Sequence, residues 1–440
     1  MAKVPKRIAN TIINALQGGV VPRIGLPYIA VGRKQEIEAL LHDVSVIEEG
    51  GGAFRFVVGK YGSGKSFLLQ TIRNYGMDRN FVVMDADLSP ERRLHGTKGQ
   101  GLATYRELMR NLSTKTRPDG GALPLLLDKW INSICMETAG AGTVQQEDPA
   151  FMQAVQQRIF KVAAEMEELV HGFDFAKLLV MYYRAYMDDD AAVRANVLKW
   201  FRGEYATKTE VRQALSVGIM IDDDNWYDYL KLFARFFVKA GYRGLLIMLD
   251  ELVNIYKIPN PVTRQYNYEK LLAMYNDTMQ GKAAYIGFLV SGTPQCMEDT
   301  RRGVFSYEAL RSRLAGGRFA EGQGRDLLAP VIRLAPLTNE ELYVLMEKLA
   351  AIHSELFEYP STVTEQELIQ FIQAEYTRMG ADQNLTPREV IRDFLSLLNL
   401  MYQDPRKRIS DLMGTDSFSF AAADPDAMRE PSGTFAEFDI

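Results

Sequence analysis

Residues 59–66 of the chain read Gly-Lys-Tyr-Gly-Ser-Gly-Lys-Ser, and they follow the apolar run Phe-Arg-Phe-Val-Val at 54–58. The octapeptide fits G-x-x-x-x-G-K-[ST], a pattern whose glycines let backbone N–H groups approach phosphate oxygens without a Cβ in the way. The apolar run predicts a buried strand at 54–59, and the residues from Ser66 to about Asn74 predict a helix. The helix N-terminus adds unpaired N–H groups to such a loop. The segment therefore predicts a nucleotide-binding α/β fold.

The side chains of this loop predict a site for ATP and Mg²⁺. Lys65 is expected to reach the β- and γ-phosphates, and the Ser66 hydroxyl is expected to ligate the metal. Further contacts with the nucleotide are expected from the rest of the loop and from the first turn of the helix: Gly59, Tyr61, Gly62, Ser63, Gly64 and Phe67.

A second element, at residues 245–251, fits the same chemistry. It reads LLIMLDE, an apolar strand that ends in two carboxylates. Asp250 would hold Mg²⁺ through water, and Glu251 would polarise the attacking water, which favours hydrolysis over mere nucleotide storage. The alternative is a strand that ends in solvated acids, as many strands do.

The order of strands and helices predicts a parallel sheet with ligands beyond its carboxyl ends. Five strands are expected, at 54–59, 81–85, 245–249, 284–290 and 331–334. Between the second and third strands the pattern becomes helical, near 101–112, 123–138, 151–170, 174–186 and 189–202. Three aspartates at 222–224 are expected to cap a helix from about Asn225 to Ala240. Tyr182, Tyr183, Tyr186 and Trp200 are expected to form a helical core stripe in preference to a platform for nucleic acid bases.

The P-loop and the Asp-Glu strand end together resemble the AAA+ ATPases, in particular the branch of replication-initiator and transposition-helper ATPases. Upstream, Tyr-Ile-Ala-Val-Gly-Arg at 28–33, followed by Gln-Glu-Ile-Glu at 35–38, is similar to the element that packs around adenine in that family. The resemblance implies that Val31 and Gly32 line the base. A simple entry from a strand into a helix is the alternative.

Three downstream segments extend the resemblance. Ser-Gly-Thr-Pro at 291–294 is similar to the sensor-1 position, which implies a polar contact with the γ-phosphate or the water from Thr293, or alternatively from Ser291. Leu-Arg-Ser-Arg-Leu at 310–314, ahead of two glycines at 316–317, resembles the arginine-finger element and implies Arg313, with Arg311 as the alternate. A solvated cationic helix face is the other interpretation. Leu-Thr-Pro-Arg-Glu at 385–389 resembles sensor 2 and implies Arg388, with Thr386 as the helix N-cap.

Within AAA+, three features resemble the ATP-binding proteins of bacterial BREX phage-defence systems: the long helical insertion, Asn-Trp-Tyr-Asp-Tyr-Leu at 225–230, and the 310–317 segment. The resemblance implies an oligomeric ATPase that acts on double-stranded DNA or on a helicase, nuclease or methyltransferase of the defence system. The alternative is a nucleotide-dependent switch or scaffold with slow turnover and no direct DNA contact. The expected parts are an N-terminal helix (1–25), the first part of the AAA+ core (26–100), the helical insertion (101–220), the second part of the core (221–337), a helical lid (338–408) and an acidic tail (409–440).

Composition limits the remaining classes of function. The net charge is −5, and the stretch 409–440 holds seven acidic residues and one arginine, so this tail is expected to be disordered. It stands where replication initiators carry a basic winged helix. Several basic clusters, which include Arg301 and Arg302, are compatible with DNA binding. The alternative is that they are ordinary solvated surfaces. The two cysteines are expected to be free thiols, and no histidine cluster predicts a metal site. No run approaches the roughly 20 apolar residues of a membrane span. A cytoplasmic protein with no membrane contact is therefore expected.

Overall fold

The computed structural model describes residues 3–140, 149–164, 171–316, 326–378 and 386–413. The chain forms two compact units. One, here called the lid unit, comprises Met1–Lys34, Val58–Thr71 and Arg333–Ile440, and the other, the sheet unit, comprises Gln35–Val57 and Ile72–Ile332. The P-loop therefore packs with the lid unit, whereas the acidic strand end belongs to the sheet unit.

A five-stranded sheet organises the sheet unit, in the order β2-β3-β4-β1-β5. Its strands are β1 (Gly52–Val58), β2 (Val82–Asp87), β3 (Leu245–Asp250), β4 (Ile286–Gly292) and β5 (Val331–Arg333). The pairs β2–β3 and β3–β4 are parallel. All five predicted strands are confirmed, with ends that differ by at most two residues. Every residue of β4 and all but the last of β3 are buried, as continuous apolar runs in a parallel sheet require.

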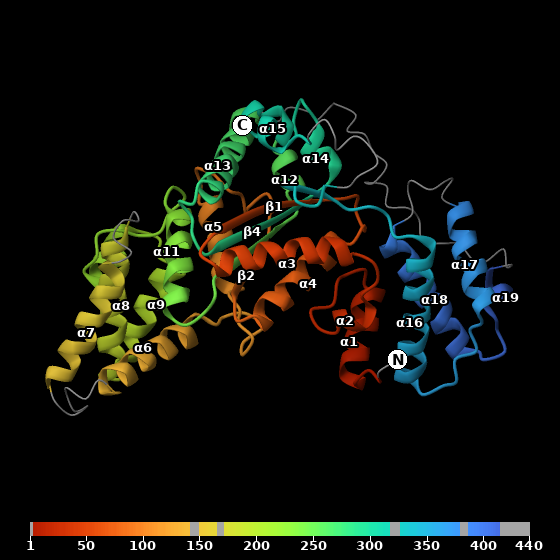
Figure 1. The fold of residues 1–440 in the computed structure, drawn as a ribbon, viewed down its shortest axis with the longest axis horizontal. Helices are drawn as coiled ribbons and strands as arrows, with labels where there is room; N and C mark the ends of the chain where they lie inside the picture. Colours follow the sequence, from red (N-terminus) through yellow and green to blue (C-terminus); the bar gives the residue numbers. More distant parts are fainter. Residues whose placement is uncertain (1–2, 141–148, 165–170, 317–325, 379–385, 414–440) are drawn as a thin grey trace. The chain divides into compact units, whose positions relative to one another are not determined.

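Helices that precede and follow residues 123–215 in the sequence cover the sheet, including α5 (Gln100–Arg110), which was predicted as part of the insertion 101–220 (Figure 1). α5 packs on β2, and α11 (Trp226–Lys239) packs on β3 and on α5. α3 (Lys34–Glu48) approaches β4 so closely that a Cβ on Gly287 would lie 2.4 Å from Cδ1 of Ile47. The remaining helices of the core are α4 (Lys65–Asp78), α12 (Val253–Tyr256), α13 (Pro261–Met279), α14 (Pro294–Glu298) and α15 (Glu308–Leu314).

The insertion forms a helical bundle in which neighbours along the chain pack on one another (Figure 1). Its helices are α6 (Leu123–Gly140), α7 (Pro149–Ala164), α8 (Gly172–Met187), α9 (Ala191–Phe201) and α10 (Lys208–Leu215). Tyr182, Tyr183 and Trp200 are buried, which confirms these members of the core stripe, whereas Tyr186 is only half-buried. The Tyr182 hydroxyl donates to Asp128. α10 was not predicted from the sequence, although Thr207 and Glu210 have the spacing of a capping box at its start.

The prediction that the aspartates at 222–224 cap the helix that follows them is confirmed in part, for Asp222 alone. Its Oδ1 accepts hydrogen bonds from the backbone N–H groups of Asp224 and Asn225, at 3.1 and 3.2 Å, in the turn that enters α11. The N-cap of α11 is Asn225, and it makes no side-chain capping bond. The carboxylate of Asp223 instead accepts hydrogen bonds from the backbone N–H groups of Gly99 and Leu102, each at 2.7 Å, at the start of α5. The unpaired N–H groups of a helix terminus can be satisfied by any nearby acceptor, and here the acceptor is distant in sequence.

The lid unit is built on α16 (Asn339–Phe357), α17 (Glu365–Arg378) and α18 (Pro387–Gln403). α1 (Lys6–Gln17) packs on α16 and α18, beside the short helix α2 (Leu26–Ile29), as Figure 1 shows. Ile12 of α1 is buried in one cluster with Leu349 and Leu397 of the lid helices. The amphipathic N-terminal helix therefore belongs to the core of the lid.

Part of the predicted disordered tail is folded. α19 (Ile409–Met413) packs on α17 and α18, with Ile409 fully buried, so the prediction was wrong for these residues. Arg408 anchors the segment by donating two hydrogen bonds, of 3.0 and 2.8 Å, to the carboxylate of Glu367. The rest of the tail, 414–440, lies outside the described residues.

Three findings bear on the composition. Cys135 and Cys296 carry thiols that are not joined in a disulfide bond. Among the described residues, no group of three or more histidine, cysteine or acidic side chains is arranged to hold a metal ion. In the same part of the chain, no helix combines the length and the apolarity that crossing a bilayer demands.

We predict that the lid unit loses stability at acidic pH through His353. This buried side chain joins α16 to α18, because its Nε2 lies 3.0 Å from Oδ1 of Asn399, while its Nδ1 lies 2.8 Å from the Tyr359 hydroxyl. Burial lowers the pKa of His353 below its ordinary 6.5. Below pH 6.5 the unfolded chain therefore binds a proton at this histidine more readily than the folded chain does. The contribution of neutral His353 to the stability of the fold is present above pH 6.5 and is lost as the pH falls below it.

Thermal unfolding of the wild type and of His353→Gln between pH 5 and 8 tests this prediction. The variant should be less stable at pH 7.5 but should lose less stability on acidification. His42→Gln, at an exposed position, serves as the control and should follow the wild type. A wild-type curve that stays as flat as that of His353→Gln would contradict the prediction.

Candidate active site

The P-loop has the backbone conformation that its glycines predict. It runs from the end of β1 into α4, and Gly62 and Gly64 adopt left-handed φ values of 72° and 93°. A Cβ on Gly64 would meet nothing within 4 Å, so this glycine is required by conformation and not by space. At Gly59 space is the reason for glycine, because a Cβ there would lie 2.4 Å from Oγ of Ser63. The result is a loop whose backbone can surround an anion at a helix N-terminus.

The predicted phosphate-binding lysine lies within the loop. The Lys65 side chain is buried, and its Nζ donates hydrogen bonds of 2.9 Å to the carbonyl oxygens of Gly59 and Lys60. The same Nζ lies 5.4 Å from the ring centroid of Tyr61. Both of these acceptors belong to the loop itself, so these bonds keep the ammonium within the loop.

The start of α18 lies against this loop. A Cβ on Gly62 would come within 2.7 Å of Oγ1 of Thr386 and 3.1 Å of Cβ of Arg388. Thr386 occupies the N-cap position but makes no capping bond, since its hydroxyl donates to Glu389 at 2.8 Å. The structure thus places Arg388, the predicted sensor-2 arginine, beside the P-loop, with its side chain exposed. Leu385, the first residue of that motif, lies outside the described residues.

The predicted adenine element is docked on α16. Gly32 has a φ of 61°, and a Cβ there would lie 2.5 Å from Oε1 of Glu341. Val31 packs on the lid core, and the Lys348 ammonium donates to the Ala30 carbonyl at 2.6 Å. Arg33, to which no role was assigned from sequence, donates from Nη2 to the Ser63 carbonyl of the P-loop at 3.0 Å. The element is therefore tied both to the lid helix and to the loop.

At the end of β3, the Asp250 carboxylate accepts two hydrogen bonds through Oδ1. One comes from the backbone N–H of Glu251 at 2.8 Å, and the other, a short contact, comes from the Ser291 hydroxyl of β4. Glu251 itself adopts a left-handed φ of 62°, which is rare for a residue other than glycine, asparagine or aspartate. Such outliers cluster at functional sites.

Of the two sensor-1 candidates, the structure places Ser291 against Asp250. Strand register explains this placement, because Ser291 stands one step beyond the paired residues Leu249 and Val290. Thr293 is instead the N-cap of α14, where its hydroxyl accepts from the backbone N–H of Cys296 at 3.3 Å. Thr293 stays the sequence-based choice for sensor 1, and Ser291 is the hydroxyl that contacts the acidic strand end.

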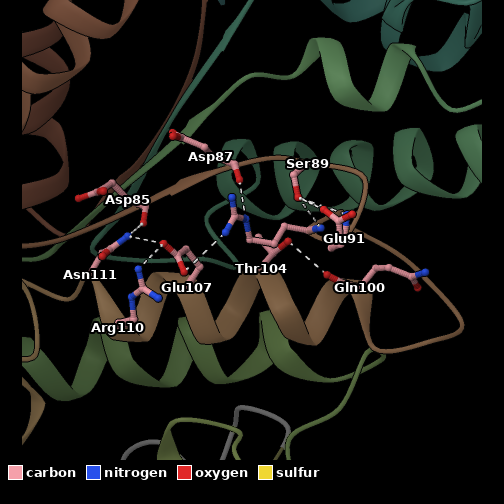
Figure 2. Close-up of polar contacts among 10 residues, drawn as sticks. Asp85, Asp87, Ser89, Glu91, Gln100, Thr104, Glu107, Arg110 and Asn111 are labelled. Carbon is pink, nitrogen blue, oxygen red and sulfur yellow. Dashed lines mark hydrogen bonds and ion pairs between the residues drawn. The ribbon is translucent and has the colours of Figure 1, made fainter. Parts of the chain in front are cut away.

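A carboxylate that sequence reasoning missed, Asp87, ends β2 directly beside Asp250 in the strand register. Asp87 is exposed at the end of β2, but the atoms around its carboxyl group exclude part of the surrounding water, and this desolvation, followed by the negative charge of Asp250, raises the pKa of Asp87. The signal was the sequence Asp-Ala-Asp at 85–87, closing a strand next to β3. Figure 2 shows how the chain leaves this strand end toward α5, where Asn111 donates to the Asp85 carbonyl at 2.9 Å and to Glu107 at 3.2 Å.

The two arginine-finger candidates have different partners on α15. Arg313 donates to Oδ1 of Asn276 on α13 at 3.1 Å and to the Ala309 carbonyl at 2.7 Å. Arg311 pairs with the carboxylate of Glu308 at 2.6 Å. Arg313 is thus held by neutral acceptors that an incoming phosphate could replace at low cost in charge. Gly317, at the end of the motif, lies outside the described residues.

A glycine-rich loop between β1 and α4, a sheet in the order β2-β3-β4-β1-β5 and an acidic end on β3 define a P-loop protein of the AAA+ type. The model of the family described as BREX system ATP-binding protein BrxC/D matches residues 4–417. The chain belongs to this family and is an ATP-binding protein of a BREX phage-defence system, which implies other proteins of that system as partners.

Among solved structures, the chain is similar to the ORC2 protein of Aeropyrum pernix, solved as ADPNP–ADP complexes. The identity is 13%, the likeness covers 83% of this chain and 67% of that chain, and the TM-score is 0.30, which is too low to carry an argument. No curated protein matches the chain.

We predict that Gly64→Ala abolishes most ATP binding without a matching loss of fold. A Cβ at a φ of 93° is strained even in open space, and relief of that strain would turn loop N–H groups away from the phosphates. Gly241→Ala is a matched control, because Gly241 has a φ of 84° and equally open space but lies in the turn after α11.

Equilibrium binding of a fluorescent ATP analogue and thermal unfolding check this prediction. Both variants should lose about 1–2 kcal/mol of stability, the usual strain of a left-handed alanine. Only Gly64→Ala should lose affinity. Equal nucleotide affinity in the two variants would remove the loop from the binding site.

Proposed function

We propose that the chain is an ATPase that binds ATP with Mg²⁺ at residues 59–66 and hydrolyses it with the carboxylates that end β3. The observation that carries the proposal is the conformation at Glu251, where a non-glycine residue is held left-handed directly after a carboxylate that is bound to the Ser291 hydroxyl. A strand that merely ended in solvated acids would not need this strained turn.

Each residue of the loop has a role in the proposal. Lys65 neutralises charge on the β- and γ-phosphates, and Ser66 and Asp250 hold Mg²⁺, which would offset the charge of the phosphate oxygens. The backbone N–H groups at Gly62 and Gly64 cradle the phosphates, which their left-handed φ angles support. The base lies against Val31 and Gly32, and the remaining loop contacts come from Gly59, Tyr61, Ser63 and Phe67.

Hydrolysis in this proposal depends on Glu251, which polarises the attacking water. Ser291 orients Asp250 through the hydrogen bond between them, and Thr293 is the second candidate for the sensor-1 role. Arg388 acts as sensor 2, supported by its position against Gly62. Arg313 acts as an arginine finger toward the nucleotide of a neighbouring subunit, so the active form is a homo-oligomer.

Glu251→Gln should bind ATP with Mg²⁺ as the wild type does but lose turnover by about 10²-fold or more, the usual loss when a general base is removed. Lys65→Ala should lose binding itself. Glu49→Gln, at an exposed carboxylate, is the control and should leave both properties unchanged. Nucleotide affinity and steady-state phosphate release separate these outcomes. If Lys65→Ala bound ATP as tightly as the wild type, the proposed function would be wrong.

The arginine finger gives a second test, because Arg311 and Arg313 lie on the same helix with different partners. Arg313→Ala should abolish turnover and leave ATP affinity nearly intact, whereas Arg311→Ala should only break the surface pair with Glu308. Turnover and affinity are measured for both variants. Equal losses of binding and turnover in Arg313→Ala would withdraw the finger assignment.

A nucleotide-dependent switch or scaffold, with slow turnover and no direct DNA contact, is the second candidate. One observation favours it: Arg302, part of a basic cluster, donates instead to the carbonyls of Tyr256 and Ile258 at 3.4 and 3.5 Å. That arginine is occupied in the fold. An ATPase rate that rises with duplex DNA, with a steep salt dependence, supports action on DNA, and an unresponsive rate supports the switch.

A further inference from the structure

The strained turn at Glu251 needs something to hold it, because a left-handed φ of 62° is unfavourable for a glutamate. Among the backbone bonds of the turn, the Leu252 N–H donates to the Ser291 carbonyl of β4 at 3.0 Å, whereas the N–H and the carbonyl of Glu251 itself form local bonds. The Glu251 N–H donates to its neighbour Asp250, and the Asn254 N–H donates to the Glu251 carbonyl at 3.0 Å. Bonds of this kind can form in many turns, so they do not by themselves select the left-handed conformation.

A side chain joins this turn to a second part of the sheet. Nδ2 of Asn254 donates to the carbonyl of Leu88 at 2.8 Å, and it also lies 3.4 Å from the carbonyl of Glu251. Leu88 in turn donates its N–H to the Asp250 carbonyl at 3.0 Å. The four residues therefore form a closed ring of hydrogen bonds from β3, across to the exit of β2, and back to the turn.

The chemistry of the ring requires a primary amide at position 254. An amide nitrogen carries two hydrogens, and here the two acceptors are carbonyl oxygens from different segments of the chain. Alanine would provide neither donor, and a carboxylate would repel both carbonyls. The half-buried position of Asn254 limits replacement by water on both sides at once.

We propose that Asn254 is a positioning residue for hydrolysis, which holds the backbone of Glu251 in its left-handed turn by tying it to Leu88. The inference rests on the proposed function, since it acts through Glu251. It also links the acidic strand end to the segment that leads from β2 into α5, where Arg92 donates to the Asp87 carbonyl at 2.9 Å and lies 3.8 Å from Glu107.

Asn254→Ala tests the inference in the full-length chain. The kcat for ATP hydrolysis should fall about tenfold, the scale of one lost hydrogen bond, while KM and ATP affinity change less than about twofold. Hydrogen exchange in peptides that cover 250–256 should become faster. Both effects follow if the turn samples other conformations once the amide is absent.

Asn80→Ala is a matched control, because Nδ2 of Asn80 donates to the Gly241 carbonyl at 2.9 Å near the opposite ends of β2 and β3. It should lower the melting temperature without changing kcat or exchange at 250–256. The double variant Glu251→Gln/Asn254→Ala should be no slower than Glu251→Gln alone, since the amide acts only through that carboxylate.

The outcomes separate the two proposals. If Glu251→Gln is inactive but Asn254→Ala keeps wild-type kcat and exchange, the inference falls and the proposed function stands. If the asparagine variant slows the Glu251→Gln background by the same factor, Asn254 has a general structural role and the inference also falls. If Glu251→Gln turns over like the wild type, both proposals fall together.

Discussion

The backbone of the P-loop is the constraint on which the rest of the site depends. An anion can be surrounded by N–H groups only where the chain turns through left-handed conformations, and Gly62 and Gly64 provide these. The absence of a side chain at Gly62 serves a second purpose, because the start of α18 lies against it, with Thr386 and Arg388 at contact distance from a Cβ there. The same glycine thus serves the loop conformation and the approach of the lid.

The sheet provides the second half of the chemistry through strand order. Because β2, β3 and β4 are parallel neighbours in register, Asp87, Asp250 and Ser291 come together at one end of three strands. A hydroxyl that bonds Asp250 fixes one of its oxygens, while the nearby charge of Asp250 raises the pKa of Asp87. The turn after β3 stores strain at Glu251, and bonds to Leu88 and Asn254 balance it. Rigid strands fix the positions of these side chains, and the candidate functional residues lie at the strand ends and in the turns that follow them.

The lid unit has a core assembled from both ends of the described chain. α1, α16, α17, α18 and α19 share one hydrophobic cluster, and Arg408 secures its last helix to Glu367. The segment Ala30–Arg33 connects this core with the P-loop through Lys348 and Ser63. Family membership and the P-loop identify an ATP-binding protein. The insertion bundle, with its aromatic core, remains the part of the fold to which no chemistry is assigned.

Short-range patterns in the sequence determined the P-loop, the five strands, the acidic strand end and the insertion core, because each depends on residues within one element. Only the tertiary structure decided that Asp223 caps α5, that Ser291 contacts Asp250, that α1 and α19 belong to the lid core, and that Asn254 reaches Leu88. Each of these depends on a contact between elements far apart in the chain. The spacing of residues along one element carries no information about which distant donor or acceptor will stand beside it, and the packing of the elements on one another supplies that information.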